Sequence, residues 1–159
     1  MNPAISNPSL IQDVIAKRCL ALLIDVCAIL MIWLVLGVFL GVFGLLTLGL
    51  GWHLFGLMPL VPFFYHFLTL GRFGATPGQH AMGLCVRRVE DLGMPTWLQA
   101  FISVLCFYAT LALSGILLLV ALATEGHRTL HDLAAGLIVV RADALGTAPT
   151  AYRFGRFSL

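Results

Sequence analysis

Charged residues are scarce in this 159-residue chain, and one long stretch has none. Only 10% of the residues are Asp, Glu, Lys or Arg, whereas 60% are hydrophobic and the mean hydropathy is +1.01. No charge occurs between Val26 and Gly71. Such a stretch suits a hydrocarbon core of roughly 30 Å crossed twice by helices of about 20 residues. The composition therefore predicts an integral membrane protein and excludes a disordered chain or an ordinary soluble domain.

Signals for several other classes of protein are also missing. A net charge of +2 with scattered arginines does not suggest nucleic acid as a partner. No Gly-rich phosphate loop, nucleophile elbow or metalloprotease motif occurs, so we expect neither an enzyme nor a cofactor. His127 and His131 are four residues apart but lack a third ligand at a suitable spacing, so no metal site is expected. Without C-x-x-C spacing, the cysteines are expected to be small buried hydrophobic residues: Cys19, Cys27, Cys85 and Cys106.

Apolar segments and turn signals predict a single membrane domain over residues 1–159. The first two segments are joined by a glycine-rich turn at 44–51 and should form an antiparallel helical hairpin. Pro59 and Pro62 lie inside the second segment, and each removes a backbone donor, so we expect a kink there. The predicted apolar segments are about 19–43, 52–70 and 97–123.

Two short segments outside the apolar runs resemble each other and read as strands. Residues 83–91 and 136–143 share Gly-Leu-x-Val-x-Arg-x followed by an acidic residue. Their β-branched character predicts a small two-stranded sheet in the cytoplasm, although a chance similarity between short runs is the alternative. The expected fold is thus an all-α polytopic membrane protein, with a helical hairpin, a third apolar helical segment and a small cytoplasmic β element.

The third apolar segment decides the topology. As one straight helix, 97–123 would put the two strands on opposite sides of the membrane and would export Arg128 and Arg141, against the positive-inside rule. A bend at Ser114-Gly115 would instead make a hairpin that re-enters the cytoplasm. We therefore favour both termini in the cytoplasm over three simple crossings. The final residues 152–157 interleave arginine and aromatic residues, which suits a headgroup tether or a disordered tail.

Asp25 is the candidate functional acid because it lies inside the first apolar run. A carboxylate there costs at least about 2.5 to 3.5 kcal/mol, so it must find a partner, reach water or stay protonated. Arg18 is seven positions away, about 10 Å along a helix, which is too far for a short direct bond. His66 should lie at the depth of Asp25 and could share a proton with it; the alternative is a histidine facing Tyr65, a backbone carbonyl or the headgroups.

Gly37 and Gly41, followed by Gly44, place small residues on one helix face. Such a face permits close helix contact, either within the chain or between two copies. The expected partners are therefore the lipid bilayer and either a second copy of this chain or other membrane proteins.

Three sequence elements in order resemble the RDD family of bacterial membrane proteins, named for one arginine and two aspartates. They are the run from Arg18 to Asp25, then Thr76-Pro-Gly78 with the Gly83-Leu84 strand, and finally Arg128-Thr-Leu-His-Asp132 leading into Ala135-Gly136. Gln79, Cys85 and Leu137 depart from the usual residues of the family.

The resemblance implies a bacterial inner-membrane protein in which Asp132 is the second aspartate. It also implies that the turn of His131 and Asp132 docks on Arg18 at the cytoplasmic boundary. The predicted polar cluster is Arg18, Asp25, His66, His131 and Asp132. Two functions remain open: a non-catalytic membrane scaffold or accessory subunit, which we favour, and a small cation or proton-coupled transporter that uses Asp25.

Overall fold

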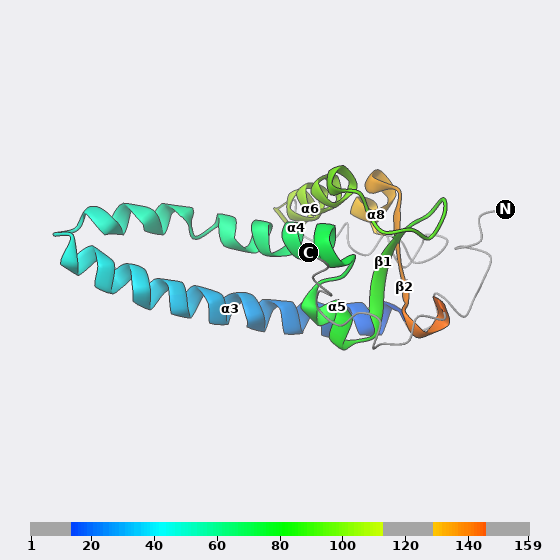
Figure 1. Ribbon diagram of the computed structural model, residues 1–159, viewed down its shortest axis with the longest axis horizontal. Helices are drawn as coiled ribbons and strands as arrows, with labels where there is room; N and C mark the ends of the chain where they lie inside the picture. The colour runs from blue at the N-terminus through cyan, green and yellow to red at the C-terminus, as the bar shows by residue number, and fades with distance from the viewer. Residues whose placement is uncertain (1–13, 113–128, 146–159) are drawn as a thin grey trace, which may run out of the picture.

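The computed structural model describes residues 14–112 and 129–145 and is mostly helical (Figure 1). Two long helical arms form a hairpin that extends away from a compact region of short helices and a small sheet. The elements, with η for a 3-10 helix, are α3 (Val14–Leu46), η1 (Leu50–Leu57), α4 (Leu60–Phe73), α5 (Pro77–Ala81), β1 (Leu84–Arg88), α6 (Trp97–Ala112), α8 (Leu130–Ala135), β2 (Leu137–Arg141) and η3 (Asp143–Leu145).

Helix α3 is the clear apolar span of the molecule. Its 33 residues run from Val14 to Leu46, longer at both ends than the predicted 19–43, and correspond to about 50 Å of helix. By length and composition α3 can cross a membrane. The pair formed by η1 and α4 passes the same test only if it is taken together as one bent span.

The second apolar segment is broken at Pro59 rather than continuous. Helices η1 and α4 meet there at an angle of 51°, which confirms the kink predicted from the prolines. Pro62 has no N–H to donate to the carbonyl of Met58, four residues earlier. That carbonyl instead accepts hydrogen bonds from the indole Nε1 of Trp33 on α3, at 3.2 Å, and from the Val61 N–H, at 3.1 Å. A side chain of one arm thus stabilises the break in the other.

The tip of the hairpin is a tight turn with two left-handed residues. Leu48 has φ 52° and Gly49 has φ 95°, and the indole of Trp52 packs on Gly44, where any Cβ would overlap it. Gly44 therefore makes the close contact expected of a small residue. Gly37 and Gly41 do not, since a Cβ at either position would have no other atom within 4 Å.

The two segments with the shared strand pattern form an antiparallel pair, β1 with β2, in which Leu84 faces Arg141 and Arg88 faces Leu137. Alternate residues point to opposite faces. One face packs on the helices through a core of Val14, Leu70, Leu84, Val86, Ala100, Val104, Ala135, Leu137 and Val139. Cys85, Ile138 and Val140 are buried on the other face.

Helix α6 packs on α4 through aromatic rings. Phe63 and Phe67 of α4 both contact Phe101, and Phe67 also meets Trp97, with centroid distances of 5.5 to 5.9 Å. The predicted bend at Ser114-Gly115, the rest of segment 97–123 and the tail at 152–157 lie outside the described residues.

The expectation that all four cysteines are buried is wrong for two of them. Cys85 is buried in β1 and Cys106 is half-buried, but Cys19 and Cys27 are exposed on α3. Cys19 lines the cavity beside α3, and at both positions an apolar side chain suits lipid as well as a protein core. All four are free thiols.

Candidate functional site

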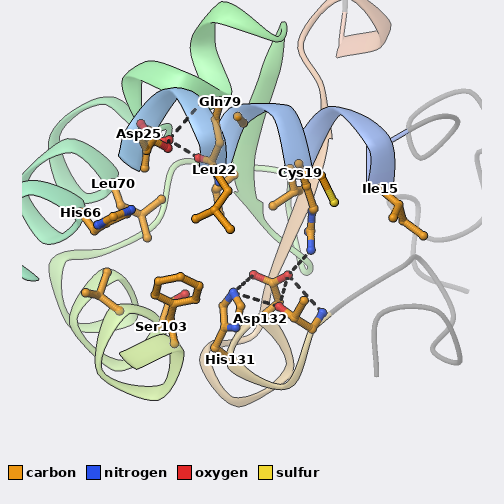
Figure 2. Close-up of a pocket in the computed structure, with 18 residues that line it drawn as sticks. Ile15, Cys19, Leu22, Asp25, His66, Leu70, Gln79, Ser103, His131 and Asp132 are labelled. Atoms are coloured by element: carbon orange, nitrogen blue, oxygen red, sulfur yellow. Dashed lines mark hydrogen bonds and ion pairs between the residues drawn. The ribbon is translucent and has the colours of Figure 1, made fainter. Parts of the chain in front are cut away.

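The five residues of the predicted polar cluster line one cavity of about 210 Å³ (Figure 2). It lies between the first turns of α3, the end of α4, α6, α8 and the sheet. Arg18 and Asp25 come from α3, His66 from α4, and His131 and Asp132 from α8. Apolar side chains, including Leu22, Leu70, Val104 and Phe107, separate the polar groups.

Arg18 and Asp132 form a buried ion pair at one end of this cavity. Nη1 of Arg18 lies 2.9 Å from Oδ2 of Asp132, and the two side chains are 15% and 4% exposed. Asp132 also caps the start of α8, because its Oδ2 accepts hydrogen bonds from the backbone N–H and the hydroxyl of the N-cap residue Thr129, at 3.3 and 2.8 Å. One carboxylate therefore holds the start of α8 and attaches α8 to α3. This ion pair is the contact between Arg18 and the turn of His131 and Asp132 that the resemblance implies.

Burial and neighbouring charges set the ionisation of Asp132 and His131. Burial opposes ionisation of Asp132, but Arg18, His131 and the hydrogen bonds from Thr129 outweigh it and lower the pKa of Asp132 below its ordinary value. Burial also lowers the pKa of His131, an effect that Asp132 opposes and Arg18 adds to. At neutral pH the pair is an ionised aspartate beside a neutral histidine. Since the Thr129 hydroxyl donates to Asp132, His131 Nε2 is the N–H donor to that hydroxyl, at 2.9 Å.

Asp25 is at the opposite end of the cavity and is engaged by three donors. Its Oδ1 accepts from the Tyr65 hydroxyl at 2.9 Å and the Gly78 N–H at 2.8 Å, and its Oδ2 accepts from the Thr76 hydroxyl at 2.5 Å. The side chain is 3% exposed. Three donors on two oxygens are the arrangement that a deprotonated carboxylate accepts. Asp25 thus connects α3 to α4 and α5.

The Thr76-Pro-Gly78 sequence explains how α5 approaches α3 so closely. Thr76 is the N-cap of this short helix and forms a capping box with Gln79, and Pro77 and Gly78 are the first two helical residues. Pro77 occupies the first helical turn, where its missing N–H costs nothing. A Cβ on Gly78 would overlap the carbonyl oxygen of Ala21 and crowd the Asp25 carboxylate. Only glycine lets this backbone N–H reach Asp25.

His66 does not contact Asp25 directly. It instead faces Tyr65 and a backbone carbonyl, which was the alternative to a shared proton. Its Nδ1 lies 3.0 Å from the Pro62 carbonyl and 2.9 Å from the Tyr108 hydroxyl, and its ring meets the Tyr65 ring edge-on at 5.2 Å. A carbonyl only accepts, so Nδ1 carries the proton in this geometry. Tyr65 therefore lies between His66 and Asp25, which keeps them close but indirectly connected.

The possible metal ligands among the described residues do not cluster. Over 14–112 and 129–145, no group of three or more His, Cys, Asp or Glu side chains could hold a metal ion. The spacing of His127 and His131 cannot be followed further, because His127 lies outside the described residues.

Sequence reasoning located the acids and the arginine but missed most of their hydrogen-bond partners. Tyr65, Thr76, Gly78 and Thr129 hold the two aspartates, and Tyr108 holds His66. Two signals were available: Thr76-x-x-Gln79 and Thr129-x-x-Asp132 both match the capping-box spacing. No local pattern indicates the tyrosines, since α4 and α6 bring them in from distant parts of the sequence.

A long apolar helix, a bent apolar companion and a buried polar cluster at one end define a helical membrane domain. The sequence model of the RDD family matches residues 14–136, from the start of α3 to the residue that caps the end of α8. The chain belongs to the RDD family and is a membrane protein. Neither a search of curated proteins nor a search of solved structures found a match.

Proposed function

We propose that the protein is a non-catalytic membrane scaffold or accessory subunit, in which the polar cluster holds the helices and the sheet in a fixed arrangement. The observation that carries the proposal is that both buried aspartates are occupied by protein donors. Asp25 accepts three hydrogen bonds, and Asp132 accepts an ion pair and the bonds from Thr129. An acid that carries an exchangeable proton needs a state in which its hydrogen-bond donors have left. The three donors to Asp25 come from two elements, α4 and α5, which would have to move away together.

The second candidate is a small cation or proton-coupled transporter that uses Asp25. The feature that favours it is the cavity itself, because Asp25 and His66 both line a space of about 210 Å³ at one end of an apolar span. Intramembrane acids mark ion pathways in many membrane proteins. Against it, one hairpin without an inverted repeat offers little for alternating access.

Flux in proteoliposomes distinguishes the two functions. Purified wild type and Asp25→Asn are reconstituted side by side, and sodium, potassium and proton movement is followed under imposed pH and ion gradients. The scaffold proposal expects wild-type vesicles to match protein-free vesicles. Cation movement that needs wild-type Asp25, with a folded but inactive Asn variant, would replace the scaffold with the transporter.

The proposed setting is the inner membrane of a bacterium, with two crossings and both termini in the cytoplasm. In that orientation Lys17, Arg18, Arg72, Arg87 and Arg88 all stay on the cytoplasmic side, as the positive-inside rule favours. The bilayer is one partner, and the other is a second copy or a different membrane protein. A reporter fused to the C-terminus and read from both sides of the membrane tests the orientation; an external reporter signal would contradict it.

A further inference from the structure

The ion pair uses only one corner of the Arg18 guanidinium. Nη1 faces Asp132, whereas Nε and Nη2 are buried and have no hydrogen-bond partner in the part of the chain that the structure describes. Nε–H and the adjacent Nη2–H form one of the edges through which arginine makes bidentate contacts. Buried donors that stay unpaired are rare and costly, so such an edge points to an acceptor that completes it.

The charges around the cavity decide what kind of acceptor fits. Asp132 already neutralises Arg18, and the geometry of Asp25 is that of a second carboxylate. His131 is neutral at neutral pH because burial lowers its pKa. His66 faces the cavity while its Nδ1 donates to the Pro62 carbonyl. Another negative charge would be repelled, so a neutral oxygen acceptor is favoured over a phosphate or a carboxylate.

The apolar wall of the cavity and the depth of Arg18 in the bilayer further restrict the class of ligand that fits. Ile15, Leu22, Leu70, Val104 and Phe107 give the cavity an apolar wall beside Arg18. Arg18 lies near the start of α3, where the apolar run meets the polar region. The ester carbonyls of glycerolipids occupy the corresponding level of a bilayer, between headgroups and acyl chains. A carbonyl oxygen has two lone pairs and accepts from both Nε–H and Nη2–H.

We propose that the cavity between α3, α4, α6 and α8 is a binding site for an acyl chain of a membrane glycerolipid, whose ester carbonyl accepts hydrogen bonds from Nε and Nη2 of Arg18. The acyl chain packs on Leu22, Leu70, Val104 and Phe107. The lipid then supplies an acceptor for the two Arg18 donors that the described residues leave unpaired; Nδ1 of His131, which is also buried without a partner, is an acceptor and is not paired by the carbonyl. The site goes beyond the scaffold proposal and does not depend on it, because a scaffold and a transporter would both retain such a lipid.

The test compares two lipids with the full-length protein in detergent. One is phosphatidylcholine with ester-linked chains, and the other is its ether-linked counterpart with the same headgroup and chain lengths but no carbonyl. Lipid retention is measured by native mass spectrometry over a range of concentrations. The ester lipid should bind wild type about tenfold more tightly, the difference expected from losing the carbonyl contacts. Equal affinity for the two lipids, or no retained lipid, would overturn the proposal.

Two variants test the wall and the arginine edge separately. Ser103 is buried on α6 and lines the cavity, so Ser103→Leu should fill the space and abolish retention of both lipids. Leu105→Phe adds bulk on the exposed face of the same helix and should bind like wild type. Arg18→Lys keeps a charge for Asp132 but has no fork, so it should retain lipid without preferring the ester.

If Ser103→Leu does not fold, the test rests on two measurements: the affinities of wild type for the ester and ether lipids, and the same comparison in Arg18→Lys. An ester preference that persists in Arg18→Lys would assign the carbonyl to another donor and overturn the proposal. Tighter binding of a free fatty acid anion than of the ester lipid would also overturn it, because the site would then select a charged oxygen.

Discussion

The two ends of the helical hairpin are built on different principles. The apolar end, residues 26–58, has exposed Leu, Val and Phe side chains along both arms, and a hydrogen bond from the indole of Trp33 to the Met58 carbonyl joins the arms. The polar end comprises residues 14–25 of α3, the end of α4, α5, α6, α8 and the sheet, and it contains both buried aspartates and the hydrophobic core. The fold is therefore held at one end, while the other end is shaped for lipid.

The largest expected effect comes from breaking the ion pair of the polar end. Arg18→Ala leaves the Asp132 carboxylate buried without its cation, which should lower the free energy of unfolding by about 3–5 kcal/mol. Arg72→Ala removes an exposed arginine from the end of α4 and should change stability by less than about 0.5 kcal/mol. Reversible unfolding in mixed micelles measures both.

The double variant sharpens that result. Asp132→Ala removes the buried charge together with the cap of α8, so Arg18→Ala with Asp132→Ala should cost clearly less than the sum of the single variants. Strict additivity would mean that the two side chains do not interact, and the contrast between the two ends would then rest on Asp25 alone.

The second effect concerns the other aspartate of the polar end. Asp25→Asn turns one acceptor oxygen into a donor that faces the Thr76 hydroxyl or the Gly78 N–H, which should cost about 2 kcal/mol. Thr76→Val loses one bond to Asp25 and the cap of α5, and should cost about 1–2 kcal/mol. Combined, the two should cost less than their sum. Unchanged unfolding of Asp25→Asn would remove this aspartate from the stabilising contacts.

A smaller effect is expected from pH through His131. Because its pKa in the folded protein is below the ordinary 6.5, the unfolded chain takes up this proton first as the pH falls. Its contribution to stability is thus complete above pH 6.5 and is lost below it, by at most about 1.4 kcal/mol per pH unit. Asp132 acts lower, losing its contribution as the pH falls below 3.8.

The variant His131→Phe isolates the histidine contribution. Just below pH 6.5, the free energy of unfolding of this variant should change less with pH than that of wild type. The loss of stability below pH 3.8 that comes from Asp132 should remain. Urea unfolding at a series of pH values measures this. If the free energy of unfolding changed with pH equally in the two proteins, the pKa of His131 would be the same in the folded and unfolded states.

The smallest effect is expected at the apolar end. Trp33→Phe removes the indole donor to the Met58 carbonyl but keeps an aromatic ring, and should cost about 0.5–1.5 kcal/mol. Leu34→Met, at an exposed neighbouring position of α3, serves as the control. If Trp33→Phe were as destabilising as Arg18→Ala, the comparison between the two ends would fail.

The sequence predicts the apolar elements well, because lipid imposes long uncharged runs and proline imposes the break at residue 59. It also identifies Asp25, since a charge inside an apolar run stands out, and Arg18 near the start of that run, whereas Asp132 was identified from the family resemblance. The connections among them were harder. The pairing of Arg18 with Asp132 came from family resemblance, and the binding of Asp25 by Tyr65, Thr76 and Gly78 depends on tertiary packing of segments 40 or more residues apart. The expected burial of Cys19 and Cys27 failed because lipid-facing and core positions share the same composition.

Arg18 and Asp25 project from one unbroken helix about 10 Å apart. A single contact would allow α3 to rotate about its axis or to tilt. Contacts from Arg18 to α8 and from Asp25 to α5 restrict both motions. A torque applied to the far end of α3 is therefore transmitted to α5 and α8 and, through them, to the sheet of β1 and β2.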